Sequence, residues 1–374
     1  MKDGRISAVA SPLKESAATE IDADGAVVSP GFVDSHIHLD KAGTVTPRSF
    51  RPGGIGERVQ DLGRLKRQYR PDAVRDRVEG LAMGLVRRGV VAARTNVDVD
   101  PTAELRGLEG VLAARERLRG YIDIQVFAFA QEGIVRHPAV PGMLEKALSL
   151  GADGLGGHTS IEPGAREHVQ TILRLARDHD VDVDFHVDEN GDPKNSMMEY
   201  VIDQTTQAGY GGRVNAIHCC ALGLMASKDV VRLSKKAADA GLNVTICPTV
   251  MALDCPLAPI DVLAQAGVNV SLGSDNLRDP INPLGTGDPL IAGNVLALTQ
   301  KLFTEDQLSY LFSAVTSNGA ATIRLEDYDL RPGGWADFVI LDCLSPSEAV
   351  LNAPGRRDVF RRGKPLNSPN GPAG

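Results

Sequence analysis

The chain has 374 residues, of which 43% are hydrophobic and 24% charged, and its formal net charge is −8. This composition is typical of a globular protein with a large core, built as one large domain or as one large and one small domain. The acidic balance argues against nucleic acid or an anionic membrane as a partner, because both need a basic face. No apolar run approaches the roughly 20 residues that span a bilayer, and Met1–Arg5 contains no apolar signal core.

Eight apolar runs alternate with helical segments along most of the chain. The predicted strands are Val27–Leu39, Val90–Val99, Ile122–Phe129, Ala152–Gly157, Val181–Val187, Arg213–Cys219, Asn243–Pro248 and Val268–Ser274. The predicted helices include Pro71–Arg88, Thr102–Leu118, Pro141–Leu150, Arg166–Asp180, Ser196–Ala208, Lys228–Ala240 and Pro259–Ala266. The apolar content of the strands is near-continuous, as in parallel strands buried on both faces. Eight alternating units over about 300 residues favour a (β/α)8 TIM barrel over an open doubly wound sheet.

The two ends of the chain have a different pattern. Arg5–Ala10 and Glu20–Val28 are predicted as short strands, Trp335–Asp342 as another, and Asp358–Lys364 as a hairpin. We expect residues 1–30 and 331–367 to form one small β domain beside the barrel. Residues 31–330 would then form the barrel domain, and residues 368–374 a disordered tail.

The five cysteines are Cys219, Cys220, Cys247, Cys255 and Cys343. An odd number without metal-type spacing predicts free thiols in a reducing compartment, and we therefore expect a cytoplasmic protein. The adjacent pair Cys219-Cys220 is best explained as small buried residues at a strand end.

Histidine and aspartate side chains close several of the predicted strands. His36 and His38 end the first, His186 and His218 end two others, and Asp275 follows Gly273-Ser274. Strand residues alternate faces, so His36 and His38 point to the same side and can bind one ion. A lone histidine after a strand is more often a hydrogen-bonded core residue, which is the simpler explanation for His218 taken alone. The histidine pair, the third histidine and the aspartate together predict a mononuclear hydrolytic metal site.

At this point the sequence resembles a known family. Ser29–Lys41 is similar to the first-strand signature of the amidohydrolase superfamily, and most similar to its cytosine deaminase-like branch. Further similar segments are Arg94–Asp100, Gln125–Gly133, His186–Glu189, Ser274–Gly285 and, in the flanking β domain, Ala336–Leu341. Members of this branch open with a longer segment, so Met1 implies a wrong start codon, a truncation or a reduced β domain.

The resemblance implies roles for particular residues. His36, His38, His186 and Asp275 would hold one divalent metal ion, zinc or iron, whose bound hydroxide attacks a ring carbon bearing an amine. Glu189 would shuttle the proton to the ring nitrogen. Because Glu189 follows His186 by three residues, we expect the strand to end near Val187 and the loop to turn Glu189 inward. His218 would act beside the metal-bound water, and Gln131 would contact the substrate.

The sequence also departs from cytosine deaminase. Asn276 stands in place of a second acid, Ile281-Asn282 in place of aromatic residues, and Asn96 in place of a histidine. Lys41 and Asp275-Asn276 instead resemble the N-isopropylammelide isopropylaminohydrolases, which lack the glutamate that Glu189 supplies. We therefore expect free cytosine to be a poor substrate.

Other polar residues at strand ends are candidate substrate contacts. Lys41 is either a rim ion pair or a cation facing the substrate, and we favour the second, which would suit a ring with an oxyanion. Asn276 and His158 are further candidates. Asp98 and Asp100 are balanced between substrate contact and capping the helix start at Pro101-Thr102. The remaining histidines are expected to be solvated: His137, His168 and His179.

We expect a hydrolase acting on the carbon–nitrogen bonds of cyclic amidines, namely a deaminase of a pyrimidine, triazine or related ring. One alternative is release of an N-alkylamine, or opening of a cyclic amide, by the same site. A second is a non-catalytic barrel-fold binding protein. The expected partners are a small heterocyclic substrate and, in a homo-oligomer, further copies of this chain.

Overall fold

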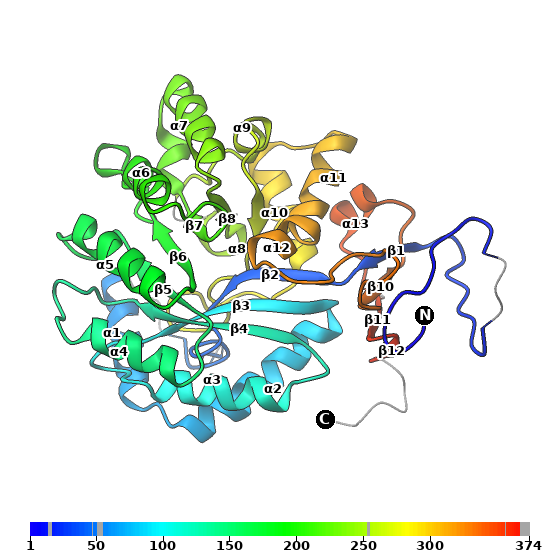
Figure 1. The fold of residues 1–374 in the computed structure, drawn as a ribbon, viewed down its shortest axis with the longest axis horizontal. Helices are drawn as coiled ribbons and strands as arrows, with labels where there is room; N and C mark the ends of the chain where they lie inside the picture. The colour runs from blue at the N-terminus through cyan, green and yellow to red at the C-terminus, as the bar shows by residue number, and fades with distance from the viewer. Residues whose placement is uncertain (14–16, 47, 51–54, 253–254, 356, 367–374) are drawn as a thin grey trace.

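An eight-stranded parallel barrel forms the centre of the molecule (Figure 1). The structure, a computed structural model, describes residues 1–13, 17–46, 48–50, 55–252, 255–355 and 357–366. The barrel strands are β2 (Phe32–Ile37), β3 (Val90–Asp98), β4 (Asp123–Ala130), β5 (Gly154–His158), β6 (Asp182–Val187), β7 (Val214–His218), β8 (Asn243–Ile246) and β9 (Val270–Leu272). They pair in chain order, each parallel to the next. The predicted (β/α)8 TIM barrel is confirmed, and the near-continuous burial of its strands explains their apolar runs.

The helices lie around the barrel, most of them on its outer face (Figure 1). They are α1 (Ile55–Arg67), α2 (Pro71–Arg87), α3 (Arg106–Arg117), α4 (Val140–Ser149), α5 (Ala165–Asp178), α6 (Met198–Ala208), α7 (Ser227–Asp239), α8 (Pro248–Met251), α9 (Ile260–Gln265), α10 (Pro289–Gln300), α11 (Glu305–Ala314), α12 (Ser317–Thr322) and α13 (Pro346–Asn352), with short 3-10 turns η1 (Pro193–Asn195) and η2 (Cys220–Leu224). The sequence patterns did not predict α1. Within the described parts of the chain, no helix has both the length and the apolar character needed to cross a membrane.

The predicted strand Val27–Leu39 is in fact two strands in two different sheets. β1 (Val27–Pro30) and β2, which begins at Phe32, are separated only by Gly31. A Cβ on Gly31 would lie 2.2 Å from Val91, so only glycine permits this close passage between the sheets. The prediction of one continuous strand was wrong because both halves are apolar and only the tertiary structure separates them.

A second sheet combines the two ends of the chain. Its order is β1-β10-β11-β12, with antiparallel pairs throughout, and its other members are β10 (Phe338–Leu341), β11 (Arg357–Arg361) and β12 (Lys364–Pro365). The predicted strand Arg5–Ala10 was wrong. That segment makes only isolated bridges, because it meets the turn at Gly333-Gly334 rather than an extended neighbour. Of Glu20–Val28, only Val27 and Val28 are in a strand. The predicted disordered tail lies outside the described residues.

The barrel closes at the carboxyl ends of β2 and β9. Ile37 forms a parallel bridge with Asp275, and the Asp275 backbone N–H donates to the His36 carbonyl over 2.8 Å. A Cβ on Gly273 would lie 2.8 Å from the His36 Cβ, so the glycine allows the two strands to approach. This closure places the Asp275 carboxylate directly beside His36 and His38.

Candidate metal centre and active site

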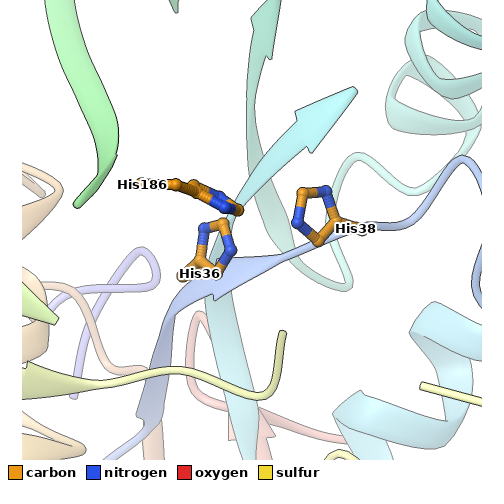
Figure 2. Close-up of side chains that lie close together, drawn as sticks. All are labelled: His36, His38 and His186. Carbon is orange, nitrogen blue, oxygen red and sulfur yellow. The ribbon is translucent and has the colours of Figure 1, made fainter. Parts of the chain in front are cut away.

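Three histidine rings converge at the carboxyl end of the barrel (Figure 2). His36 lies within β2, His38 one residue past its end, and His186 near the end of β6. Ring centroids are 4.8 Å apart for His36 and His38, 4.8 Å for His36 and His186, and 5.4 Å for His38 and His186. Asp275 Oδ1 lies 3.4 Å from His36 Nε2 and 3.3 Å from His38 Nε2. The structure thus brings together all four predicted metal ligands.

The chemistry of this group fits a divalent ion. Among its buried atoms, His36 Nε2, both ring nitrogens of His186 and Asp275 Oδ1 have no hydrogen-bond partner. Buried polar atoms are costly unless they are satisfied, so several such atoms converging on one point indicate a missing ligand. Burial lowers the pKa of His38 to about 4 and holds the pKa of His186 well below its usual range, so both imidazoles are neutral. Three imidazoles and a carboxylate are a typical donor set for zinc or iron.

Asn96 contacts both histidines of the pair, and Asp184 in turn holds Asn96. His38 Nδ1 lies 2.8 Å from the Asn96 carbonyl, which fixes the ring proton on Nδ1 and leaves Nε2 free to bind a metal. The Asn96 side-chain amide lies 2.9 Å from His36 Nδ1 and donates to Asp184 Oδ2 over 3.2 Å. Arg94 in turn donates to Asp184 Oδ1 over 3.0 Å. Sequence reasoning missed Asp184, although an acid inside a buried strand signals a partner.

The strand ends that carry the site use left-handed backbone conformations. The φ angles are 55° at Asp188, 71° at His218 and 56° at Asp275. Non-glycine residues adopt this region rarely, and such backbone strain concentrates at functional sites. β6 ends at Val187, as predicted, and the turn at Asp188 directs Glu189 toward the histidines.

Glu189 is held by His158, at the end of β5. Glu189 Oε2 lies 2.7 Å from His158 Nε2 and 3.6 Å from His186 Nδ1. The Ser160 backbone N–H donates to His158 Nδ1 over 3.2 Å, so the proton of the neutral ring is on Nε2 and is donated to Glu189. Burial alone would raise the pKa of Glu189, but the electrostatic interaction and the hydrogen bond with His158 hold the pKa of this carboxyl well below its usual range. Glu189 is therefore a carboxylate with one oxygen occupied by a fixed donor.

His218, at the end of β7, lies beside the candidate metal ligands His36 and His186. Its ring centroid is 4.8 Å from that of His186, and it can share an ion with His36 and Asp275. Both of its ring nitrogens are buried without a hydrogen-bond partner, and burial lowers its pKa. A neutral imidazole with unoccupied nitrogens can bind or orient a water molecule at the metal.

A cavity of about 530 Å³ opens onto these residues, a size typical of small-molecule sites. All four predicted substrate contacts line it: Lys41, Gln131, His158 and Asn276. Helix α1, which the sequence patterns missed, supplies one wall with Arg58, Val59, Leu62 and Lys66. Asn276 donates to Asp279 Oδ2 over 2.6 Å, so its amide is already oriented by a buried partner.

Lys41 does not lie at the rim of this cavity. Its side chain is 2% exposed, and Nζ lies 2.8 Å from Asp98 Oδ1. Lys66 Nζ lies 2.8 Å from the other Asp98 oxygen and 2.7 Å from Asp100 Oδ2. Asp100 also accepts the backbone N–H groups of the turn that follows it, over 2.8 Å each. It thus closes a turn and does not cap a helix start, because α3 begins only at Arg106. Sequence reasoning missed Lys66 because its helix was not predicted.

The prediction that His168 is solvated was wrong. His168 is fully buried on the barrel-facing side of α5, beside Val169 and Ile172, and its Nδ1 lies 2.8 Å from Glu162 Oε1. Glu162 also accepts backbone N–H groups from residues 134–136, so the pair anchors the loop after β4. A single polar residue such as His168 in a helix does not reveal which segment of the chain will cover it.

Comparison with known proteins assigns the family. A model of the amidohydrolase family matches residues 19–68 and 59–365. The chain is 31% identical to N-isopropylammelide isopropyl amidohydrolase of Pseudomonas sp. (strain ADP), over 96% of this chain and 91% of that protein. The crystal structure of N-isopropylammelide isopropylaminohydrolase from Burkholderia multivorans is similar at a TM-score of 0.89 and 30% identity, covering 98% of this chain and 93% of that one. That of 5-methylcytosine deaminase from Klebsiella pneumoniae, liganded with 5-fluorocytosine, is similar at a TM-score of 0.91 and 28% identity, covering 100% and 94%. The chain therefore belongs to the amidohydrolase family.

Proposed function

We propose that this protein is a metal-dependent hydrolytic deaminase of an amino-substituted N-heterocycle, such as a pyrimidine or a triazine. Family membership and the names of its relatives support hydrolysis of carbon–nitrogen bonds in such rings. The observation that carries the proposal is the position of Glu189. This carboxylate lies beside His186, one of the candidate metal ligands, is oriented by His158, and lines the cavity.

His36, His38, His186 and Asp275 would hold the ion. A divalent ion at that position supplies the Lewis acidity that activates water at neutral pH. Glu189 would accept a proton from the attacking water and deliver it to a ring nitrogen as the ring carbon gains oxygen. The carbon–nitrogen bond then breaks, and the amine leaves as ammonia with the second proton.

Two neighbouring histidines would assist the proton transfer. His158 donates to one Glu189 oxygen, which leaves the other free to receive the proton. His218 would donate a hydrogen bond to the oxygen that develops negative charge. Gln131 and Asn276, on the cavity wall, would orient the ring through its polar edges.

Release of an N-alkylamine is a second candidate. Part of the cavity wall is apolar, formed by Val59, Leu62, Ile161, Val250 and Met251. Such a wall can accommodate an alkyl group on the departing nitrogen, because burial of each CH₂ contributes about 0.8 kcal/mol. The 31% identity with an isopropyl amidohydrolase supports this alternative.

A substrate panel separates the candidates. Protein loaded with zinc or iron is assayed for ammonia and for alkylamine with cytosine, isoguanine, ammelide-type triazines and their N-alkylated analogues. We expect release that requires the metal, with cytosine among the poorer substrates because Asn276 replaces an acid. Absence of any amine release from every ring would contradict the proposed function. Cytosine as the best substrate would contradict only the inference drawn from Asn276.

A further inference from the structure

The lysines of the cavity are already neutralised by protein carboxylates. Lys41 is paired with Asp98, and Lys66 with Asp98, Asp100 and, over 3.1 Å, Glu132. Both ammonium groups are almost fully buried. An anionic substrate would have to compete with these carboxylates, so neither lysine offers a free positive charge.

Arg58 is different. It projects from α1 into the wall of the same cavity, and its Nη1 donates to the Ile281 carbonyl over 2.9 Å. Its Nε is buried and has no hydrogen-bond partner. Among the residues that the structure describes, no carboxylate lies within ion-pair distance of this guanidinium. Arg58 is therefore a cavity cation held in place by a backbone carbonyl but not neutralised.

The surroundings of Arg58 make this arrangement costly without an anion. Val59, Leu62 and Ile281 line the cavity beside it, and apolar neighbours reduce the hydration that would otherwise stabilise the charge. A guanidinium cannot lose its proton to escape this cost. It can instead present its remaining N–H donors to a planar anionic group, an interaction that strengthens where water is excluded.

We infer that the substrate carries an anionic group, either a ring oxyanion or a carboxylate on the ring, and that Arg58 binds it. Glu189 and Arg58 both line this cavity, so a substrate bound in it lies in the same enclosed space as both groups. This inference rests on the proposed function, because it identifies the class of heterocycle that the same site accepts. The positive charge that the sequence pattern assigned to Lys41 is supplied by Arg58.

Three rings without an amino group test the inference by binding alone. Uracil is neutral at pH 7, barbiturate carries a ring oxyanion, and orotate carries a carboxylate. Their affinities for the metal-loaded protein are measured by calorimetry in wild type, Arg58→Met and Arg58→Lys. The matched control is Arg64→Met, since Arg64 lies on the same helix with a side chain 51% exposed and pairs with Asp61 at the surface.

We expect at least one anion to bind wild type about tenfold or more tighter than uracil, as a charged hydrogen bond allows. Arg58→Met should remove that preference, Arg58→Lys should retain part of it, and Arg64→Met should retain all of it. Preference for barbiturate alone identifies a ring oxyanion, and preference for orotate alone identifies a carboxylate.

Equal binding of the three rings by wild type, or no binding of either anion, would overturn the inference. So would equal weakening of all three by Arg58→Met. A different result would contradict the proposed function alone. If anion preference depends on Arg58 but the protein releases no amine from any ring, the anion site is supported and the deaminase activity is contradicted.

Discussion

His158 was a candidate substrate contact in the sequence and is a partner of Glu189 in the structure, and one substitution distinguishes the two roles. His158→Phe keeps a planar ring but removes the N–H that donates to Glu189 over 2.7 Å. A hydrogen bond to a charged group contributes about 1.5–3 kcal/mol. If the bond orients Glu189 for proton transfer, its loss should lower kcat by about 10- to 100-fold.

The assay compares kcat and KM separately, using the best substrate from the panel described above. A positioning role lowers kcat and leaves KM nearly unchanged, because the contact acts on Glu189 rather than on the bound ring. His158→Gln should recover part of the loss, because its amide can still donate to Glu189. Metal content must be equal in all variants, since the His158 ring lies 5.3 Å from that of His186.

His179→Phe is the matched control, because His179 lies at the end of α5 with a side chain 38% exposed and away from the cavity. It should leave both constants unchanged. A raised KM with an unchanged kcat in His158→Phe would refute the positioning role and restore the interpretation of His158 as a substrate contact.

Further expectations concern the base, the metal and the buried charges. Glu189→Gln should keep its metal but lose about 10²–10⁴-fold in kcat, and a variant within a few-fold of wild type would make Glu189 only a loop acid. Elemental analysis should find about one equivalent of zinc or iron. His186→Ala should lose this metal, because three protein ligands hold a metal ion less well than four. Activity that survives chelation would exclude this site. Lys66→Met should lower the free energy of unfolding by about 3–5 kcal/mol, because it leaves buried carboxylates without their cation. Lys235→Met, which removes an exposed pair with Asp239, should lower it by less than about 1 kcal/mol. Equal effects of the two substitutions in urea unfolding would contradict this prediction. Burial alone would raise the pKa of Glu162, but the hydrogen bonds from His168 and the backbone lower it from 4.5 to about 2. Its stabilisation is therefore present above pH 4.5 and is lost as the pH falls toward 2, so Glu162→Gln should flatten the dependence of stability on pH in that window.

The sequence by itself determined the barrel and the metal-ligand candidates, because both are encoded in local patterns. Apolar runs alternating with helical segments specify parallel strands buried on both faces. Polar residues at the ends of such runs must gather at one rim of the barrel, since all parallel strands end there. His36 and His38 are two residues apart on one strand, so their shared direction follows from strand geometry. The role of Glu189 was implied by the family resemblance, since its spacing from His186 alone indicates no more than a loop acid.

Only the tertiary structure decided which charges neutralise one another. Lys41, Lys66 and Asp98 are separated by tens of residues, and no periodicity indicates that they form one buried cluster. The burial of His168 and the contact of the Arg58 guanidinium with the Ile281 carbonyl have the same origin, because each depends on which distant segment covers the side chain. Local patterns report which face of an element is apolar, whereas the burial and the partner of a polar side chain are decided by packing between elements that are far apart in the chain.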